Sequence, residues 1–274
     1  MEFFKSDKVY DFMKYRIPFL GLSLFLFVSS LVLISTKGLN FGIDFVGGSI
    51  IQVKYEQEAP INSIREELSK HEAFKSAVVT EFGSSDEVVI KITNTSTELG
   101  SDIGDQISSV LKTTGTFELR RVDMVGPKVG DELREKGVIA LVLALSVILI
   151  YVSYRFEWRF AVSSILALIH DLVIAIGAIS LFSVEVNLDI LAALLTVLGY
   201  SINDTIIVFD RVREKIAQSN SGELIEIIND SVSNTLSRTT LTSFTTLLVV
   251  ITLYIFGSEI ISGFSFTLLV GIVV

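Results

Sequence analysis

Two aspartates lie inside long apolar stretches of this sequence, and they are the side chains best placed to do chemistry there. Asp171 falls within Phe160–Phe182, and Asp204 falls within Leu188–Phe209. A carboxylate near the centre of a membrane helix costs roughly 2.5–3.5 kcal/mol on insertion scales, so each needs a partner or a function. We expect Asp204 to bind and release a proton, because burial opposes its charge and a nearby cation favours it.

Arg238 is the cation that the sequence places within reach of Asp204. It begins the next apolar stretch, Thr239–Phe256, at the same membrane surface at which the Asp204 stretch ends. Counting back from Asp210 places Asp204 about 9 Å inside that surface, a distance that a snorkelling arginine side chain can cover. The alternative is a static Asp–Arg pair that only holds two helices together, and the sequence leaves both open.

Polar and small residues accompany Asp204 along one face of its stretch. At helical spacing four of them share its face, and the opposite face is apolar: Thr196, Gly199, Tyr200 and Asn203. We therefore place Asn203 beside Asp204 and Arg238 on a proton pathway. The stretch after Arg238 is rich in hydroxyls, and we expect these to hold water along such a path.

Asp171 follows His170 and lies deeper than Asp204, about 18 Å from the near end of its own stretch. A relay role and a structural hydrogen bond to a neighbouring helix are equally open for it. We include Asp171 in the candidate pathway on the first interpretation.

Several enzyme classes lack their residues here. The chain has no cysteine, two histidines and no GxxxxGK[ST] loop, so we expect no metal centre, no cofactor and no nucleotide hydrolysis. Intramembrane aspartyl proteases resemble one another in a GxGD motif, and the spacing from Gly199 to Asp204 does not match it. We expect a protein that is not an enzyme.

Apolar stretches dominate the chain and predict a polytopic α-helical membrane protein. Half of the 274 residues are hydrophobic, and the net charge of −9 is carried almost entirely between the apolar runs. Five runs approach the length of about 20 residues that spans a bilayer: Ile17–Thr36, Val138–Tyr154, Phe160–Phe182, Leu188–Phe209 and Thr239–Phe256. A sixth begins near Gly263, and the sequence stops within it, so we expect a truncated sixth helix.

Lysine and arginine in the short loops indicate the orientation. They gather before the first run, at Arg155–Arg159 and after the fourth run, whereas Ser183–Asn187 and Gly257–Ser262 have none. By the positive-inside rule the N-terminus lies in the cytoplasm and residues 37–137 lie outside. We therefore expect three parts: residues 1–36 with the first helix, the outer domain 37–137, and the remaining helices in 138–274.

The outer region predicts a small α+β domain between the first two membrane helices. Strand-like runs at Ser49–Tyr55, Ala77–Phe82, Val88–Thr93 and Thr116–Val125 alternate with helical patterns after Pro60 and over Asp102–Thr113. The order β-α-β-β-α-β is the ferredoxin-like arrangement. Farther along, residues 223–236 predict a short amphipathic helix at the cytoplasmic surface, packed against neighbouring helix ends.

Motifs along the whole chain resemble the SecD/SecF family of protein-export membrane proteins, and within it the SecF branch. Five segments carry the resemblance in order: Gly42–Gly48 (GIDFVGG), Val125–Leu133 (VGPKVGDEL), His170-Asp171, Gly199–Glu214 and Ser237–Ser243. In the first motif, Gly42, Gly47 and Gly48 permit tight turns where the chain leaves the membrane, and we expect Asp44 to cap or brace the turn. We expect this motif, like Gly199, to be structural.

The resemblance implies an RND-like half of six helices in the bacterial inner membrane, paired with SecD and associated with the SecYEG translocon. It further implies that proton flow helps to draw an unfolded polypeptide outward after the SecA step, and that Asp204 and Arg238 match the proton-path positions. No nucleic-acid partner is implied. A translocon scaffold without proton coupling and half of an RND-type exporter remain the alternatives.

Overall fold

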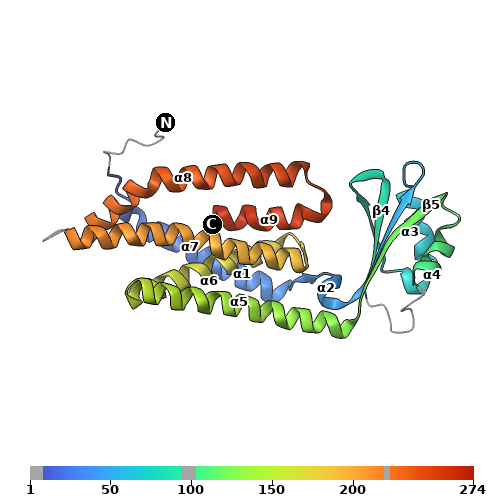
Figure 1. Ribbon diagram of the computed structural model, residues 1–274, viewed down its shortest axis with the longest axis horizontal. Coiled ribbons are helices and arrows are strands. Elements are labelled where there is room, and N and C mark those ends of the chain that lie inside the picture. The colour runs from blue at the N-terminus through green and yellow to red at the C-terminus, as the bar shows by residue number, and fades with distance from the viewer. Residues whose placement is uncertain (1–8, 94–102, 219–222) are drawn as a thin grey trace.

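The computed structural model describes residues 9–93, 103–218 and 223–274, and it shows a long helical bundle with a small sheet domain at one end (Figure 1). Two of the lysines before the first apolar run, Lys5 and Lys8, and Asp102 at the start of the second predicted domain helix lie outside the described residues. We refer to the end of the bundle that carries the domain as the sheet end, and to the other as the far end.

Five helices are long and apolar enough to cross a membrane: α1 Arg16–Thr36, α5 Pro127–Arg155, α6 Trp158–Leu181, α7 Leu188–Gln218 and α8 Leu224–Phe256. A sixth apolar helix, α9 Glu259–Val273, packs against α7 and α8. The chain is therefore a multi-pass membrane protein, as the sequence predicts. Helices α1 and α8 bury little of their surface within this chain, because their apolar side chains face outward.

Two helix boundaries differ from the prediction. Helix α5 begins at Pro127 and not near Val138, so its first turns rise out of the apolar run toward the sheet domain. Gly126 precedes it and Pro127 occupies the first helical position, where a missing N–H costs nothing. The prediction missed this start because it followed hydropathy alone.

The predicted amphipathic helix over residues 223–236 is not a separate element. Helix α8 runs without interruption from Leu224 to Phe256, so this segment is the first part of the fifth span. No proline or glycine breaks the run. Packing against neighbouring segments is confirmed, but through polar atoms: the Met13 N–H donates to Asn229 Oδ1 at 2.9 Å, and the Asn229 amide donates to Asp11. Leu224 is 59% exposed, so the apolar stripe is not the buried face.

The sheet domain has the predicted β-α-β-β-α-β order. Its elements are β2 Gly48–Tyr55, α3 Ile61–Ser69, β3 Val78–Phe82, β4 Ser84–Thr93, α4 Ile103–Leu111 and β5 Phe117–Val125. The strand order is β3-β4-β2-β5 with every pair antiparallel, which is the ferredoxin-like topology. Strand β4 begins directly after Gly83 and not at Val88, where the predicted strand starts, so residues 84–87 extend the hairpin.

One face of the sheet is covered by α3 and α4, and the domain core lies between them (Figure 1). Alternate residues of β2 point into it, among them the fully buried Ile51 and Val53, and they meet Ile64 of α3 and Ile107 of α4. The shorter elements are the 3-10 turns η1 Met13–Tyr15 and η2 Glu72–Phe74, and three pieces where domain and bundle meet: β1 Asn40–Phe41, α2 Ile43–Val46 and β6 Glu185–Val186.

Candidate functional site

Asp204 and Arg238 lie on neighbouring helices, as the sequence predicts, but no ion pair joins them among the residues that the structure describes. Asp204 is half-buried on α7, and Arg238 on α8 is exposed, with its positive charge close enough to act on the carboxylate. The contact that Asp204 Oδ1 makes is a long one of 3.5 Å from the amide of Asn203. The carboxylate is thus near a cation without being fixed by it.

Two side-chain contacts set the register between α7 and α8. The Tyr200 hydroxyl donates to Ser243 Oγ at 3.2 Å, and Lys215 pairs with Asp230 at 2.7 Å. Because the helices run antiparallel, Asp204 on α7 and Arg238 on α8 both lie between these two contacts. The Thr239 Oγ1 atom is buried without a hydrogen-bond partner in the described part of the chain. An acceptor or a water would satisfy it.

The hydroxyls of α8 mostly serve their own helix. Thr242, Thr246 and Thr252 each donate to the backbone carbonyl four residues before them. In the described part of the chain Thr239 and Thr240 make no such bond, and Ser243 accepts a hydrogen bond from Tyr200. The expected row of water-holding hydroxyls is therefore interrupted along α8.

Asp171 is held much more firmly than Asp204. Its Oδ1 lies 2.9 Å from His170 Nδ1, and its Oδ2 accepts a hydrogen bond of 2.7 Å from the Ser201 hydroxyl on α7. The other ring nitrogen of His170 lies 2.6 Å from Ser23 Oγ on α1. The hydrogen bond to a neighbouring helix that the sequence left open is present, between Asp171 and Ser201. Together with the contact between His170 and Ser23, it links α1, α6 and α7.

Asn203 and Gly199 face outward on α7. Both are exposed, and a methyl group added at Gly199 would meet no atom within 4 Å. Packing inside this chain therefore gives no reason for a glycine at this position. Together with half-buried Asp204, these residues form a polar stripe that this chain leaves uncovered.

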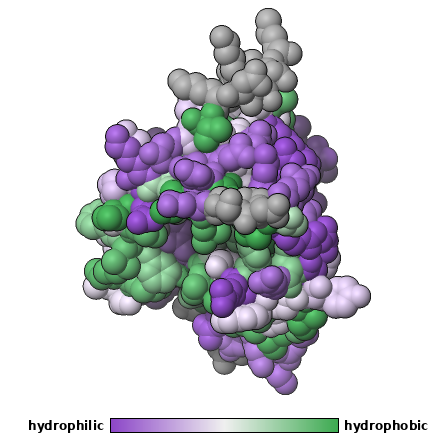
Figure 2. Space-filling view, turned by 90° about the vertical axis from the view of Figure 1, so that its left-hand side faces the viewer, coloured by the Kyte–Doolittle hydropathy of each residue, from purple (hydrophilic) through white to green (hydrophobic). Residues whose placement is uncertain are grey.

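The far end of α5, α6 and α7 carries a charge cluster that the sequence reasoning did not single out. Asp210 pairs with Arg155 and with Arg213, both at 3.1 Å, and the two guanidinium groups lie over the ring of Phe156. Figure 2 looks onto this end of the bundle and shows hydrophilic side chains gathered beside apolar ones. The cluster joins the far end of α5, and the Phe156 that follows it, to α7.

The glycine-rich motif forms the joint between domain and bundle. Asp44 does not brace its own turn: its Oδ2 accepts the backbone N–H of Leu188 at 3.0 Å and so caps α7 from a distance. The Gly42 N–H donates to Val186 O, which continues the parallel pairing of β1 with β6. A Cβ at Gly42 would lie 2.7 Å from Glu185, so close approach explains this glycine.

Gly47 and Gly48 both have positive φ, of 84° and 150°, as the tight turn requires. A Cβ at Gly47 would lie 2.8 Å from Pro127 Cα, and one at Gly48 would lie 2.2 Å from Ile92 O. A Cβ at Gly130 would likewise lie against the backbone of Phe45. The two motifs that flank the domain in sequence therefore pack on each other, and this contact fixes where α5 starts.

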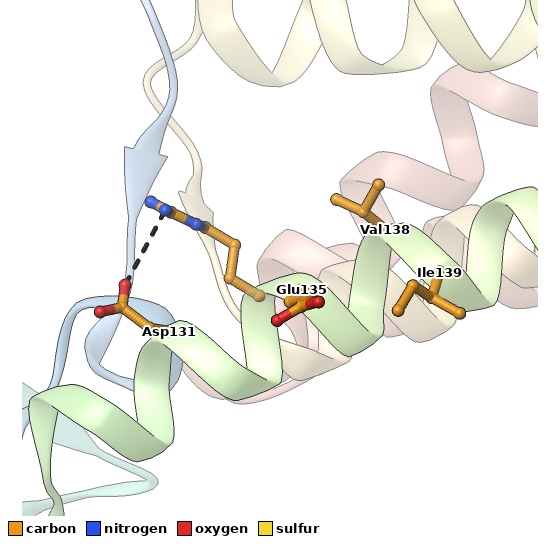
Figure 3. A pocket seen from close by; sticks show the side chains of 5 residues that line it. Asp131, Glu135, Val138 and Ile139 are labelled. Atoms are coloured by element: carbon orange, nitrogen blue, oxygen red, sulfur yellow. Dashed lines mark ion pairs between the residues drawn. The ribbon is translucent and has the colours of Figure 1, made fainter.

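No group of three or more His, Cys, Asp or Glu side chains is placed to hold a metal ion in the part of the chain that the structure describes. Figure 3 shows an open hollow beside the first turns of α5, with Asp131 and Arg134 3.8 Å apart. Its other lining residues are Glu135, Val138 and Ile139. None of the predicted proton-path residues reaches it.

Sequence reasoning missed Ser23 and Ser201, which complete the hydrogen bonds around His170 and Asp171. Serines in apolar helices are common enough that neither stands out alone. A usable signal was present for Ser201, because it precedes Asp204 by three residues and shares its side of α7. No signal for Ser23 exists without the register between α1 and α6.

The chain matches two family descriptions: "Protein export membrane protein SecD/SecF, C-terminal" over residues 106–274 and "SecD/SecF GG Motif" over residues 32–59. It is 45% identical to the protein translocase subunit SecF of Helicobacter pylori over 274 residues, which cover 100% of this chain and 85% of that protein. It is 40% identical to the SecF of Escherichia coli O157:H7 over 268 residues, covering 97% and 83%.

Solved structures of similar fold include two of SecDF. The crystal structure of SecDF from Thermus thermophilus, described as a translocon-associated membrane protein, matches with a TM-score of 0.80 and 34% identity. A SecDF structure in a super-membrane-facing form matches with a TM-score of 0.72 and 34% identity. The matches cover 98% and 97% of this chain but only 37% and 36% of those longer chains.

Proposed function

The chain belongs to the SecD/SecF family of protein-export membrane proteins, and from this premise we propose that it is a SecF-type accessory subunit of Sec-dependent translocation. It uses the proton motive force to assist the passage of unfolded polypeptide after the SecA step. The role is one of transport and not of enzymatic catalysis.

The proposed partner is a SecD-type chain. The matched SecDF chains are almost three times as long as the part that this chain covers, which leaves room for a second set of helices there. The uncovered polar stripe of α7 is where such a set would complete the site. The pair would associate with the SecYEG translocon in the bacterial inner membrane, with the N-terminus in the cytoplasm and residues 37–137 in the periplasm.

One observation carries the proton-coupling proposal: a carboxylate within an apolar span faces an arginine without forming an ion pair. In a locked ion pair Asp204 would stay ionised, because protonating the carboxylate would leave the buried charge of the arginine uncompensated. At longer range, a small movement of α8 relative to α7 changes the field that Arg238 exerts on Asp204. Such a movement favours proton uptake in one arrangement and release in the other.

The energy available is adequate for this role. A charge that crosses the full membrane potential gains about 2.3 kcal/mol per 100 mV. A bias of that size changes the ratio of two conformations by roughly fiftyfold. Loading and unloading a proton at Asp204, coupled to the α7–α8 arrangement, is therefore enough to drive a cycle of the outer domain.

The test is export into vesicles that contain this chain with its SecD-type partner, with and without an imposed proton motive force. We expect Asp204→Asn to reduce the force-dependent rate by at least about tenfold, while Asp204→Glu, which keeps a titratable carboxyl, retains a substantial part. Asp210→Asn, in the ion-paired far-end cluster, serves as the matched control for loss of a carboxylate on α7. Full force-dependent export by Asp204→Asn would reject proton coupling and leave the scaffold role.

A further inference from the structure

Four polar side chains within the helical bundle contact one another in sequence, and the contacts lead from α1 through α6 to α7. Ser23 Oγ meets His170 Nε2 at 2.6 Å, His170 Nδ1 meets Asp171 Oδ1 at 2.9 Å, and Ser201 Oγ meets Asp171 Oδ2 at 2.7 Å. We propose that His170 and Asp171 form a second proton-binding site. Ser23 connects this site to the α1 side, and Ser201 connects it to Asp204.

The fold holds these groups in place by close packing of α1 on α6. Ser30 sits against Gly177, where an added Cβ would lie 2.3 Å from the Ser30 side chain, and the Ser180 hydroxyl donates to backbone carbonyls at Leu33 and Gly38. The ring of Phe27 lies parallel to that of His170, with an interplanar angle of 4°. The contacts Ser23–His170, Ser30–Gly177 and Leu33–Ser180 join residues that are the same number of positions apart in the sequence. Helices α1 and α6 therefore run side by side in fixed register.

The hydrogen bonds show how the site takes up a proton. With Asp171 ionised, both its oxygens accept, so His170 donates through Nδ1 and the Ser201 hydroxyl donates to Oδ2. The Nε2 atom of the neutral ring then accepts the Ser23 hydroxyl. A proton that binds Nε2 gives an imidazolium, while Ser23 rotates to accept. The His–Asp pair changes from a net charge of −1 to 0, which apolar surroundings favour.

Neighbouring elements bring few competing charges. Within the apolar lengths of the packed helices, α1 between residues 17 and 36, α5 between 138 and 154 and α9 between 260 and 273 have no Asp, Glu, Lys or Arg. Along α6, Asp171 is the one ionised group after Arg159. Helix α7 contributes Asp204 within its apolar length, with Asp189 near its start and five charged residues near its end: Asp210, Arg211, Arg213, Glu214 and Lys215. Asp204 is therefore the natural exchange partner for the site.

Ser201 provides the connection. It lies three residues before Asp204 on α7, about 4.5 Å along the helix axis, so the two side chains lie on adjacent parts of one face. The imidazolium first passes its Nδ1 proton to Asp171 Oδ1, and the neutral carboxyl group turns so that the proton lies on the oxygen beside Ser201. The Ser201 oxygen then accepts this proton as its own hydroxyl proton is released toward Asp204, so one proton enters, one leaves, and His170, Asp171 and Ser201 return to their starting states. This step rests on the proposed role of Asp204.

His170→Gln tests the site, because glutamine can still donate and accept hydrogen bonds but does not titrate near neutral pH. The chain has two histidines, and the other, His71, is exposed in the sheet domain, so His71→Gln is the matched control. Export with the SecD-type partner is measured across about pH 5–8, where histidine titrates. We expect His170→Gln to lower the rate by tenfold or more and to flatten its pH dependence, with assembly and melting temperature unchanged.

A direct measurement keeps the proposal testable if that variant fails to fold. In ¹⁵N-histidine-labelled His71→Gln protein, solid-state NMR observes the ring of His170 alone. We expect a neutral ring with its proton on Nδ1 at high pH and a doubly protonated ring at low pH. A ring that stays in one state throughout, or wild-type export by His170→Gln, would overturn the second site. If Asp204→Asn also exports normally, proton coupling fails as a whole; if only Asp204→Asn is defective, the second site alone is rejected.

Discussion

At the residue scale, the two membrane aspartates are held in opposite ways. Asp171 has both carboxylate oxygens engaged at 2.7–2.9 Å, whereas Asp204 has one long contact and an unbonded arginine nearby. A carboxylate without fixed donors changes its protonation state with little rearrangement of its neighbours. This difference makes Asp204 the group that responds to helix movement and Asp171 the group that stays in place.

Glycines at the joint give a prediction at the same scale. Gly47→Ala combines a positive φ with a Cβ only 2.8 Å from Pro127, whereas Gly83→Ala has a similar φ of 74° and open space around it. We expect Gly47→Ala to lower the melting temperature of the full chain clearly more than Gly83→Ala, because both carry backbone strain of about 1–3 kcal/mol and only the first adds a clash. Equal melting temperatures would mean that Pro127 does not pack on the glycine.

The cap that Asp44 places on α7 gives a second prediction. Asp44→Ala removes the acceptor for the Leu188 N–H and is expected to cost about 0.5–2 kcal/mol of stability, while Asp44→Asn keeps an oxygen there and costs much less. Chemical denaturation of the full chain in detergent measures both. Similar losses for the two variants would show that the charge, and not the capping oxygen, matters.

At the element scale, α8 is one helix whose first part binds the segment before α1 and whose second part carries Arg238 and crosses the membrane. The Tyr10 N–H donates to Ser233 Oγ, and Asn229 bonds both Met13 and Asp11. The helix is continuous, so the part that contacts the N-terminal segment and the part that carries Arg238 belong to one element.

Hydrogen exchange tests this continuity. We expect the amides from Asn234 to Thr240 to be protected as strongly as those on either side, since an unbroken helix has no free N–H there. The exposed hairpin end at Gly83 provides a fast-exchanging reference within the same sample. Fast exchange confined to residues 234–240 would instead support two helices joined by a break.

The limits of sequence-based prediction also show at this scale. The βαββαβ order, the apolar spans and the proximity of Asp204 to Arg238 follow from periodicity, run length and shared membrane surface. The start of α5 and the continuity of α8 were missed because hydropathy marks the membrane and not the helix; Pro127 and the absence of breakers after Leu224 were the local signals. The Ser23–His170 and Asp44–Leu188 bonds join residues more than 140 positions apart, so they depend on helix packing that no local pattern specifies.

At the scale of the whole molecule, the glycine joint connects domain and bundle, and within the described residues an ion pair adds to it. Lys91 of β4 bonds Glu185, in the connection between α6 and α7, at 2.8 Å, with both side chains about one-third exposed. A movement of α7 therefore reaches the sheet domain by two routes, through the cap at Asp44 and through Glu185. The proposed coupling between the membrane helices and the sheet domain requires such contacts.

Charge reversal tests the second route. Glu185→Lys is expected to widen the distribution of distances between spin labels on the domain and on the bundle, and the double variant Glu185→Lys/Lys91→Glu is expected to narrow it again. The pair contributes only about 0.2–1 kcal/mol at this exposure, so the fold stays intact. Reversal of Lys54 and Asp86, a pair within the domain at 3.4 Å, is the control and should leave the distances unchanged. No rescue in the double variant would show that the pair does not hold the domain.

The central claim is that Asp204 takes up and releases a proton, and infrared difference spectroscopy of the full complex in lipid measures this directly. We predict a protonated-carboxyl band that grows as the pH falls, that disappears in Asp204→Asn and that shifts in position in Asp204→Glu. Changing Arg238 to Gln should raise the pH at which the band appears, because the nearby positive charge favours the ionised form. A spectrum that shows no band attributable to Asp204 at any pH would contradict proton binding by this carboxylate.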